Sequence, residues 1–270
     1  MTPVALTIAG SDPSGGAGLQ ADLKTFHQHG VYGASVVTLL TVQNTQTVSA
    51  IKILESDFVV AQLDAVLADI PPLAAKTGAL GNVANIEAVA QRAATFSFPL
   101  VVDPVMISKH GQPLIEDDAV NVLVGKLLPA AFLVTPNLFE ASKLASIQIT
   151  DLRAMEQAAL IIAESGVKHV LVKGGHFDGN AVDVLLSNGE MHRLSAKRTE
   201  TQHTHGTGCV LSAAITARLA SGADVVTAVT EAKRFITAAI RTSPGLGGGS
   251  GPVNMHANPE RSSRDLDSTP

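Results

Sequence analysis

The chain has 270 residues, 46% of them hydrophobic, and a formal net charge of −5 with one tyrosine and no tryptophan. A mildly acidic chain with so few large aromatic residues argues against a nucleic-acid surface that holds phosphates and stacks bases. One cysteine excludes an internal disulfide framework and a thiolate zinc cluster, and we see neither a long apolar run nor a basic leader. We expect one cytoplasmic domain with a sizeable core and without a membrane span or signal peptide.

Short apolar runs alternate with longer helical patterns along the chain. In chain order, the expected strands cover residues 4–8, 35–42, 100–102, 132–134 and 170–172. The expected helices cover residues 17–28, 56–67, 85–93, 119–127 and 152–164, and a further helix begins after residue 206. This rhythm predicts an α/β fold, in which a parallel sheet is covered by helices on both faces.

Each of the five expected strands is followed by small or polar residues. In open α/β sheets the ligand crevice lies outside the carboxyl ends of the strands, so these groups should converge on one site. The endings are Gly10-Ser11-Asp12, Gln43-Asn44, Asp103-Pro104, Thr135-Pro136-Asn137 and Lys173-Gly174-Gly175.

A glycine-rich turn at residues 204–209 opens the last of these helices. Gly206 and Gly208 carry no Cβ, so the backbone can approach an anion, and the first free N–H groups of the helix point at it. The turn predicts a phosphate or oxyanion site. Cys209 lies at the positive end of the helix dipole, where the pKa of a thiol tends to fall, and a thiolate there could act as a general base on an alcohol. The alternative is an inert core cysteine.

Two acidic residues and one lysine suggest that the anion belongs to a magnesium nucleotide. Asp103 and Glu140 follow expected strands and offer the hard oxygen ligands that Mg²⁺ prefers. Lys173 precedes two glycines, whose open backbone favours a phosphate neighbour. Alternatively, both acids cap helices and Lys173 extends from a strand end into solvent. His205 is expected to hold the turn by a hydrogen bond rather than to transfer a proton.

Other motifs restrict the chemistry. Gly16-x-Gly18-x-x-Ala21 formally fits a dinucleotide fingerprint, but the second strand ends in Gln43-Asn44 without an acidic ribose partner. The chain also lacks the Gly-x4-Gly-Lys-Ser/Thr sequence of a P-loop. The remaining pieces predict phosphoryl transfer, in which positioning and charge neutralisation do most of the catalysis. Three further histidines, His27, His29 and His110, are interpreted as surface residues.

Several of these motifs, in this order, resemble the hydroxymethylpyrimidine/phosphomethylpyrimidine kinases of thiamine biosynthesis, within the ribokinase-like superfamily. The carriers are residues 6–18, 20–26, 42–45, 103–106, 135–137, 173–176 and 204–209, and the match runs from about residue 4 to about residue 255. The resemblance implies a three-layer α/β/α fold with a mostly parallel central sheet, one kinase domain over residues 1–255, and a homodimer. The polar residues 256–270 are expected to form a disordered tail.

The resemblance implies two successive ATP-dependent phosphorylations, first of 4-amino-5-hydroxymethyl-2-methylpyrimidine and then of its monophosphate. It also implies the roles of the site residues. Gln43 would recognise the pyrimidine through its amide, and Asp22, Gly10 and Ala79 would line the same pocket. Gly206, Gly208 and Cys209 would form the anion hole, with Cys209 at the position where sugar kinases carry an aspartate base.

On the nucleotide side, the resemblance implies that Lys173, Asn137 and Thr204 bind ATP and that Asp103 and Glu140 serve Mg²⁺. The glycine-rich stretch at residues 243–252, by itself interpreted as a flexible connector, would lie on this side of the site.

One departure concerns Ala79, where the family typically has methionine. The smaller side chain leaves a roomier pocket that could admit a larger pyridine. A pyridoxal or pyridoxine kinase of the same fold is therefore the alternative function. A catalytically silent sensor of a vitamin precursor or nucleotide is the alternative outside the enzymes, and Cys209 makes a sugar or nucleoside kinase less favoured.

Overall fold

The computed structural model describes residues 2–107, 117–175 and 179–259. Its strands form one sheet in the order β3-β2-β1-β4-β5-β6-β7-β8-β9. The strands β2, β1, β4, β5, β6 and β7 are parallel, and β3, β8 and β9 add antiparallel edges. Their bounds are β1 Val4–Ser11, β2 Tyr32–Gln43, β3 Val48–Ile53, β4 Ala74–Thr77, β5 Leu100–Val102, β6 Leu133–Val134, β7 His169–Val172, β8 Ala181–Ser187 and β9 Glu190–Ala196.

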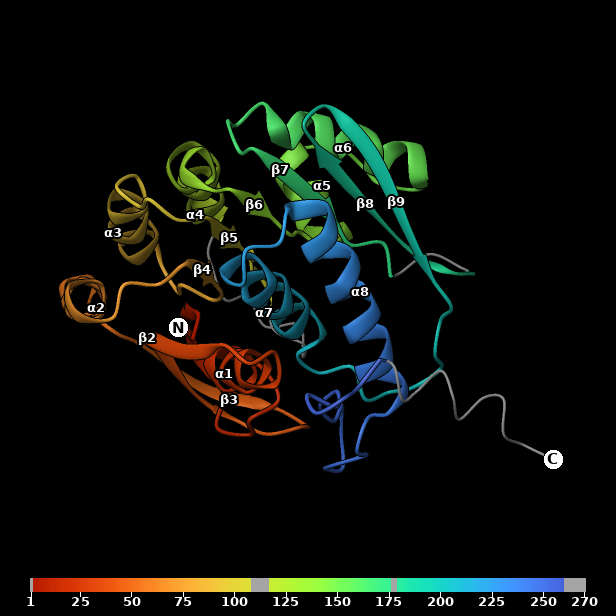
Figure 1. Ribbon diagram of the computed structural model, residues 1–270, viewed down its shortest axis with the longest axis horizontal. Helices are drawn as coiled ribbons and strands as arrows, with labels where there is room; N and C mark the ends of the chain where they lie inside the picture. The colour runs from red at the N-terminus through yellow and green to blue at the C-terminus, as the bar shows by residue number, and fades with distance from the viewer. Residues whose placement is uncertain (1, 108–116, 176–178, 260–270) are drawn as a thin grey trace.

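Helices cover both faces of the sheet (Figure 1). One face carries α1 (Gly18–Gln28), α7 (Thr207–Ala220) and α8 (Val225–Arg241). The other carries α2 (Ser56–Asp69), α3 (Val83–Ala93), α4 (Asp117–Val122) with a π-helical turn at Leu123–Leu127, α5 (Leu138–Ala145) and α6 (Leu152–Ala163). The predicted three-layer fold with a mostly parallel sheet is confirmed.

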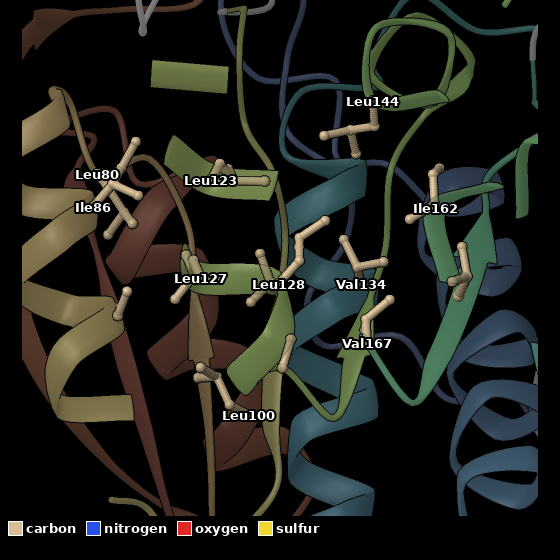
Figure 2. Close-up of a cluster of buried hydrophobic side chains, with 14 of the residues drawn as sticks. Leu80, Ile86, Leu100, Leu123, Leu127, Leu128, Val134, Leu144, Ile162 and Val167 are labelled. Carbon is tan, nitrogen blue, oxygen red and sulfur yellow. The ribbon is translucent and has the colours of Figure 1, made fainter. Parts of the chain in front are cut away.

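The central strands divide the core into two clusters. Along β5, Leu100 and Val102 face the α2–α6 side, whereas Val101 faces α1, α7 and α8. This alternation is the period of two that a strand imposes, and burial on both faces makes the parallel strands continuously apolar. Figure 2 shows part of the first cluster, where Leu100 and Val134 of the sheet lie near Leu127 and Leu128.

The five expected strands and all six expected helices are present, with bounds that differ by a few residues. The short central strand β4, the edge strands β3, β8 and β9, and the helices α5 and α8 were not expected. The edge strands are interrupted by polar residues, such as Ser49 and Lys52 in the mostly exposed β3, so they lack the continuous apolar run of the buried strands.

The packed chain continues beyond the expected boundary at residue 255. Ala257 is buried, and its carbonyl accepts a hydrogen bond from Gln28 Nε2 of α1. Ala257 therefore packs on the domain instead of belonging to a disordered tail; residues 260–270 lie outside the described residues. Among the described residues, none of the helices is long and apolar enough to cross a membrane.

Candidate active site

A cavity of about 910 Å³ runs along the carboxyl edge of the sheet. All five expected strand endings contribute to its wall, as does the first turn of α7. Near the ends of β1, β2 and β4 it is lined by Gly10, Gln43 and Ala79; beside the start of α7 by Asp103, Glu140, Thr204, Gly206, Gly208 and Cys209; and beyond β6 and β7 by Asn137 and Lys173. One proposed site residue, Asp22, is absent from this wall.

At the start of α7, two glycines let neighbouring groups lie close to the helix backbone. Gly206 caps the helix with φ +78°, and a Cβ there would lie 1.8 Å from the carbonyl oxygen of Gly16. A Cβ on Gly208 would lie 3.2 Å from Lys173 Nζ. Among the described residues, the N–H groups of Gly208 and Cys209 have no protein acceptor. Two free N–H groups, the positive end of the helix dipole and an ammonium group are the features that a site for an anion requires.

The loop after β1 is organised by a buried carboxylate. Asp12 Oδ1 accepts hydrogen bonds from the N–H and hydroxyl of Ser14, and Asp12 Oδ2 accepts from Ala17 N–H. His205 Nε2 lies 2.8 Å from the same Oδ2. Burial acts to raise the pKa of Asp12, but the hydrogen bonds from His205 and Ser14 outweigh it and hold the pKa below its usual value. His205 thus holds the turn against the first loop, as predicted from its position.

Gln43 ends β2 with its amide at the cavity wall. Its Nε2 lies 3.2 Å from His205 Nε2. Because that histidine nitrogen carries the proton donated to Asp12, it cannot also accept a hydrogen bond from the amide. The amide N–H groups of Gln43 therefore remain available to a bound molecule.

Asp103 and Glu140 are both buried, and the ammonium group of Lys173 interacts with each of them. Lys173 Nζ donates to Asp103 Oδ1 at 3.1 Å and interacts electrostatically with Glu140. Burial raises the pKa of Glu140 to about 7, with Lys173 opposing and Asp103 adding to the increase. A divalent cation bound beside these two carboxyl groups would favour the ionised form of Glu140. One or two carboxylates beside a phosphate site fit Mg²⁺, which keeps several of its waters.

The helix-capping alternative also applies to one of these acids. Glu140 Oε2 accepts the N–H of Asn137, while Asn137 Oδ1 accepts the N–H of Glu140, which completes a capping box at the start of α5. Glu140 therefore caps a helix and lines the cavity at once. Asp103 caps none of the helices in the described part of the chain; it binds Lys173 and accepts the hydroxyl of Ser212.

Cys209 is half-buried in the cavity wall. The expected fall in its pKa is wrong. Burial raises the pKa of the thiol to about 12, Asp22 and Asp103 add to the increase, and the positive charge of Lys76 only partly opposes it. Desolvation of a thiolate outweighs the helix dipole here.

Asp22 lies behind the cavity and not in its wall, so its predicted place in the substrate pocket is wrong. It faces the sheet from α1, is fully buried, and binds Lys76 Nζ at 2.8 Å and the hydroxyl of Thr7 at 2.6 Å. The helical period directs this residue into the core side of α1. Burial raises the pKa of Asp22, whereas the pKa of Lys76 is raised because Asp22, Cys209 and Asp103 outweigh its burial.

A second ion pair, missed in the sequence, closes the far end of the cavity. Asp183 of β8 binds Lys233 of α8 at 2.7 Å and accepts the N–H of Gly174 at 2.9 Å. A Cβ on Gly174 would lie 1.9 Å from Val182 O, so this glycine packs on β8. Of the two glycines after Lys173, only Gly175 has the open backbone that the sequence predicts. A single aspartate in the apolar run of β8 was the available signal.

The glycine-rich stretch contacts the turn between β2 and β3, and its expected place on the nucleotide side stays a prediction. Gly249 N–H donates to Thr45 Oγ1, and a Cβ on Gly247 would lie 2.3 Å from that same oxygen. The stretch therefore packs on the turn between β2 and β3, next to Gln43.

The interpretation of the peripheral histidines was partly wrong. His27 is exposed, but His29 is half-buried against the ring of Phe235, which lies 4.6 Å from it between centroids. His110 and His176 of the motifs lie outside the described residues.

A mostly parallel three-layer fold, an anion site at a helix start and flanking lysine and carboxylates define a small-molecule kinase of the ribokinase-like superfamily. The family model for phosphomethylpyrimidine kinase matches residues 12–254. The chain belongs to this family.

Two relatives and one solved structure are similar to the chain over most of its length. It is 45% identical over 253 residues to the hydroxymethylpyrimidine/phosphomethylpyrimidine kinase of Synechococcus elongatus, covering 93% of this chain and 96% of the relative. It is 47% identical over 251 residues to the thiamine biosynthesis bifunctional protein ThiED of Geobacter sulfurreducens, covering 92% of this chain and about half, 51%, of that longer protein. The ADP complex of Bacillus subtilis pyridoxal kinase superposes with a TM-score of 0.88 at 38% identity, covering 95% of this chain and 98% of that one.

Proposed function

We propose that the protein phosphorylates 4-amino-5-hydroxymethyl-2-methylpyrimidine with Mg-ATP, first to the monophosphate and then to the diphosphate. One observation carries the proposal: Gln43, the start of α7 and Lys173 line a single cavity. Gln43 Nε2 lies 3.2 Å from His205 Nε2, in the turn before α7, and a Cβ on Gly208 would lie 3.2 Å from Lys173 Nζ. Among the described residues, the N–H groups of Gly208 and Cys209, between these two neighbours, have no protein acceptor. This is the order in which an acceptor, a transferring phosphoryl group and a nucleotide must lie for direct transfer. The family membership supports the same reaction.

At the acceptor end, the Gln43 amide can donate to a ring nitrogen and accept from an exocyclic amino group. Ala79 and Leu39 supply apolar wall beside it, and Gly10 keeps the backbone of β1 close, since a Cβ there would lie 2.5 Å from the Leu39 side chain. These groups orient the hydroxymethyl substituent toward the start of α7.

At the transfer site, the N–H groups of Gly208 and Cys209 and the ammonium of Lys173 stabilise the charge that spreads over the phosphoryl oxygens. We assign Cys209 as the general base of the first phosphorylation, a role that requires its thiolate form. Because burial raises the pKa of this thiol to about 12, the thiolate is a minor form of the free protein near neutral pH. The second phosphorylation uses a phosphate oxygen as acceptor, which is already ionised near neutral pH because the second pKa of a phosphate monoester is about 6. We therefore assign the base a smaller role in that step.

Asp103 and Glu140 fit Mg²⁺, which when bound would neutralise nucleotide phosphate charge. Asn137 and Thr204 complete the proposed nucleotide side of the wall. We also propose assembly as a homodimer, which light scattering of the purified protein would test.

Pyridoxal phosphorylation is the second candidate function. The observation that favours it is Ala79, a half-buried wall residue with a small side chain at the acceptor end. The similarity to a pyridoxal kinase supports the same possibility.

The test is product mass after incubation with Mg-ATP and either the pyrimidine or pyridoxal. Mono- and diphosphate from the pyrimidine are expected. Monophosphate from pyridoxal alone would replace the proposed reaction by the second candidate. Absence of product from both would favour a sensor that binds without catalysis.

A further inference from the structure

A fully buried ion pair lies beneath the start of α7. Lys76 of β4 and Asp22 of α1 both have 0% side-chain exposure, and their charged atoms are 2.8 Å apart. Burying two charges costs desolvation energy that their attraction often fails to recover, so an apolar pair would serve stability as well. Stability alone is therefore a weak reason for this pair.

The pair lies next to the cavity wall. Lys76 Nζ is 3.6 Å from the position that a Cβ on Gly78 would occupy, and Gly78 lines the cavity. Helix α7 packs on both α1 and β4, which carry the two charges. Lys76 interacts electrostatically with Cys209, at the first turn of α7.

Several charged groups from different elements of the described chain act on the Cys209 sulfur. Asp22 and Asp103 supply negative charge, and Lys76 and Lys173 supply positive charge. Lys173 donates directly to Asp103 at 3.1 Å and faces the anion site, so part of its charge is already engaged. Among the residues that the structure describes, Lys76 is the other lysine whose charge lowers the pKa of this thiol.

The Asp22 carboxylate holds the Lys76 ammonium in place, but it does not cancel the effect of the Lys76 charge on the Cys209 sulfur. Its Oδ2 accepts from both Lys76 and Thr7, while its Oδ1 has no hydrogen-bond partner among the described residues. The carboxylate therefore both orients the ammonium and competes with the thiolate for its charge.

We propose that Lys76 stabilises the Cys209 thiolate from behind the cavity wall, and that Asp22 sets how much of the Lys76 charge the sulfur experiences. Both are positioning residues that need not touch substrate. Only the use of this thiolate as a base depends on the proposed kinase function. Formation of the thiolate can be measured without turnover.

The experiment is alkylation of Cys209 by iodoacetamide at pH 8, followed by intact-protein mass. Cys209 is the chain's one cysteine, so every adduct reports the same sulfur, and the rate follows the thiolate fraction. We compare wild type, Asp22→Asn, Lys76→Met and the double variant. The control is Lys126→Met, which removes a lysine from an exposed pair with Glu87, whose side chains are 56% and 45% exposed.

Asp22→Asn should accelerate alkylation at least tenfold, because it frees the Lys76 charge and lowers the thiol pKa by a unit or more. Adding Lys76→Met to Asp22→Asn should abolish that gain, while Lys126→Met should alkylate at the wild-type rate. The double variant carries no buried charge at either position, so the test holds even if Lys76→Met alone does not fold.

An unchanged or slower rate in Asp22→Asn, or a gain that survives in the double variant, would overturn the proposal. These outcomes are independent of product formation, so they separate a failure of the electrostatic role from a failure of the proposed kinase reaction.

Discussion

Glu140 provides a direct test of how the site uses buried charge. The perturbation is Glu140→Gln, which removes the charge but keeps an oxygen that can accept the Asn137 N–H, bound at 2.8 Å in the wild type. The side chain is 4% exposed, so the substitution leaves the packing nearly unchanged. The variant therefore isolates the cost of ionising this carboxyl in the absence of a cation.

The magnitude follows from the pKa. Burial raises it from 4.5 to about 7, and each pKa unit is worth about 1.4 kcal/mol, which gives an upper value of about 3 kcal/mol. Between these two pH values the folded carboxyl keeps a proton that the unfolded one has lost, so the free energy of unfolding falls as pH rises. The stabilising contribution is complete below pH 4.5 and lost above pH 7.

The assay is urea unfolding of wild type and Glu140→Gln at pH 5 and pH 8, with EDTA and without nucleotide. We expect similar free energies of unfolding at pH 5 and a variant more stable by about 1–3 kcal/mol at pH 8. The same variant should lose kinase activity, because Glu140 is the proposed Mg²⁺ ligand. A stability difference that does not change with pH would refute the reasoning.

Three further predictions concern the cavity wall. Cys209→Ala should slow the first phosphorylation by roughly 10²–10⁴-fold and the second by much less, because only an alcohol acceptor needs a base; equal losses in time-resolved product mass would contradict this. Ala79→Met should reduce any pyridoxal turnover while sparing the pyrimidine, and equal loss of both in parallel steady-state assays would count against a size-limited pocket. Gly206→Ala forces a Cβ to within 1.8 Å of Gly16 O at φ +78°, so kcat/KM should fall at least tenfold with a lower Tm. Gly125→Ala, where no atom lies within 4 Å, is its control, and matching losses in both would reject the role of the turn.

The sequence predicts the site well where a local pattern determines position. A strand followed by a polar residue places that residue at the carboxyl edge whatever the rest of the fold does, which is why Gln43, Asp103 and Lys173 all reach the cavity. The glycine turn before α7 is equally local, since the positive φ of Gly206 is a backbone requirement.

What the sequence does not predict depends on contacts between distant segments. Asp22 lies near a glycine loop in sequence, but Lys76, which is 54 residues away, holds it beneath the cavity. The thiol pKa of Cys209 follows from the burial and the charges that α1 and β4 bring to it, and a helix dipole considered alone predicts the opposite direction. Position along an element is thus easier to predict than the electrostatic setting of a side chain.

Acceptor recognition and anion binding are joined through one carboxylate. Asp12 Oδ2 accepts a hydrogen bond from Ala17 N–H, which fixes the loop, and the same oxygen accepts a hydrogen bond from His205 Nε2. That proton keeps His205 from accepting a hydrogen bond from Gln43, so the amide stays free for substrate. His205 also directly precedes Gly206, whose close approach to Gly16 sets the start of α7. The Asp12–His205 hydrogen bond thus restrains both the acceptor end, at Gln43, and the start of α7. A change at Asp12 should therefore alter acceptor affinity and phosphoryl transfer together. A change at Gln43 should alter acceptor affinity alone.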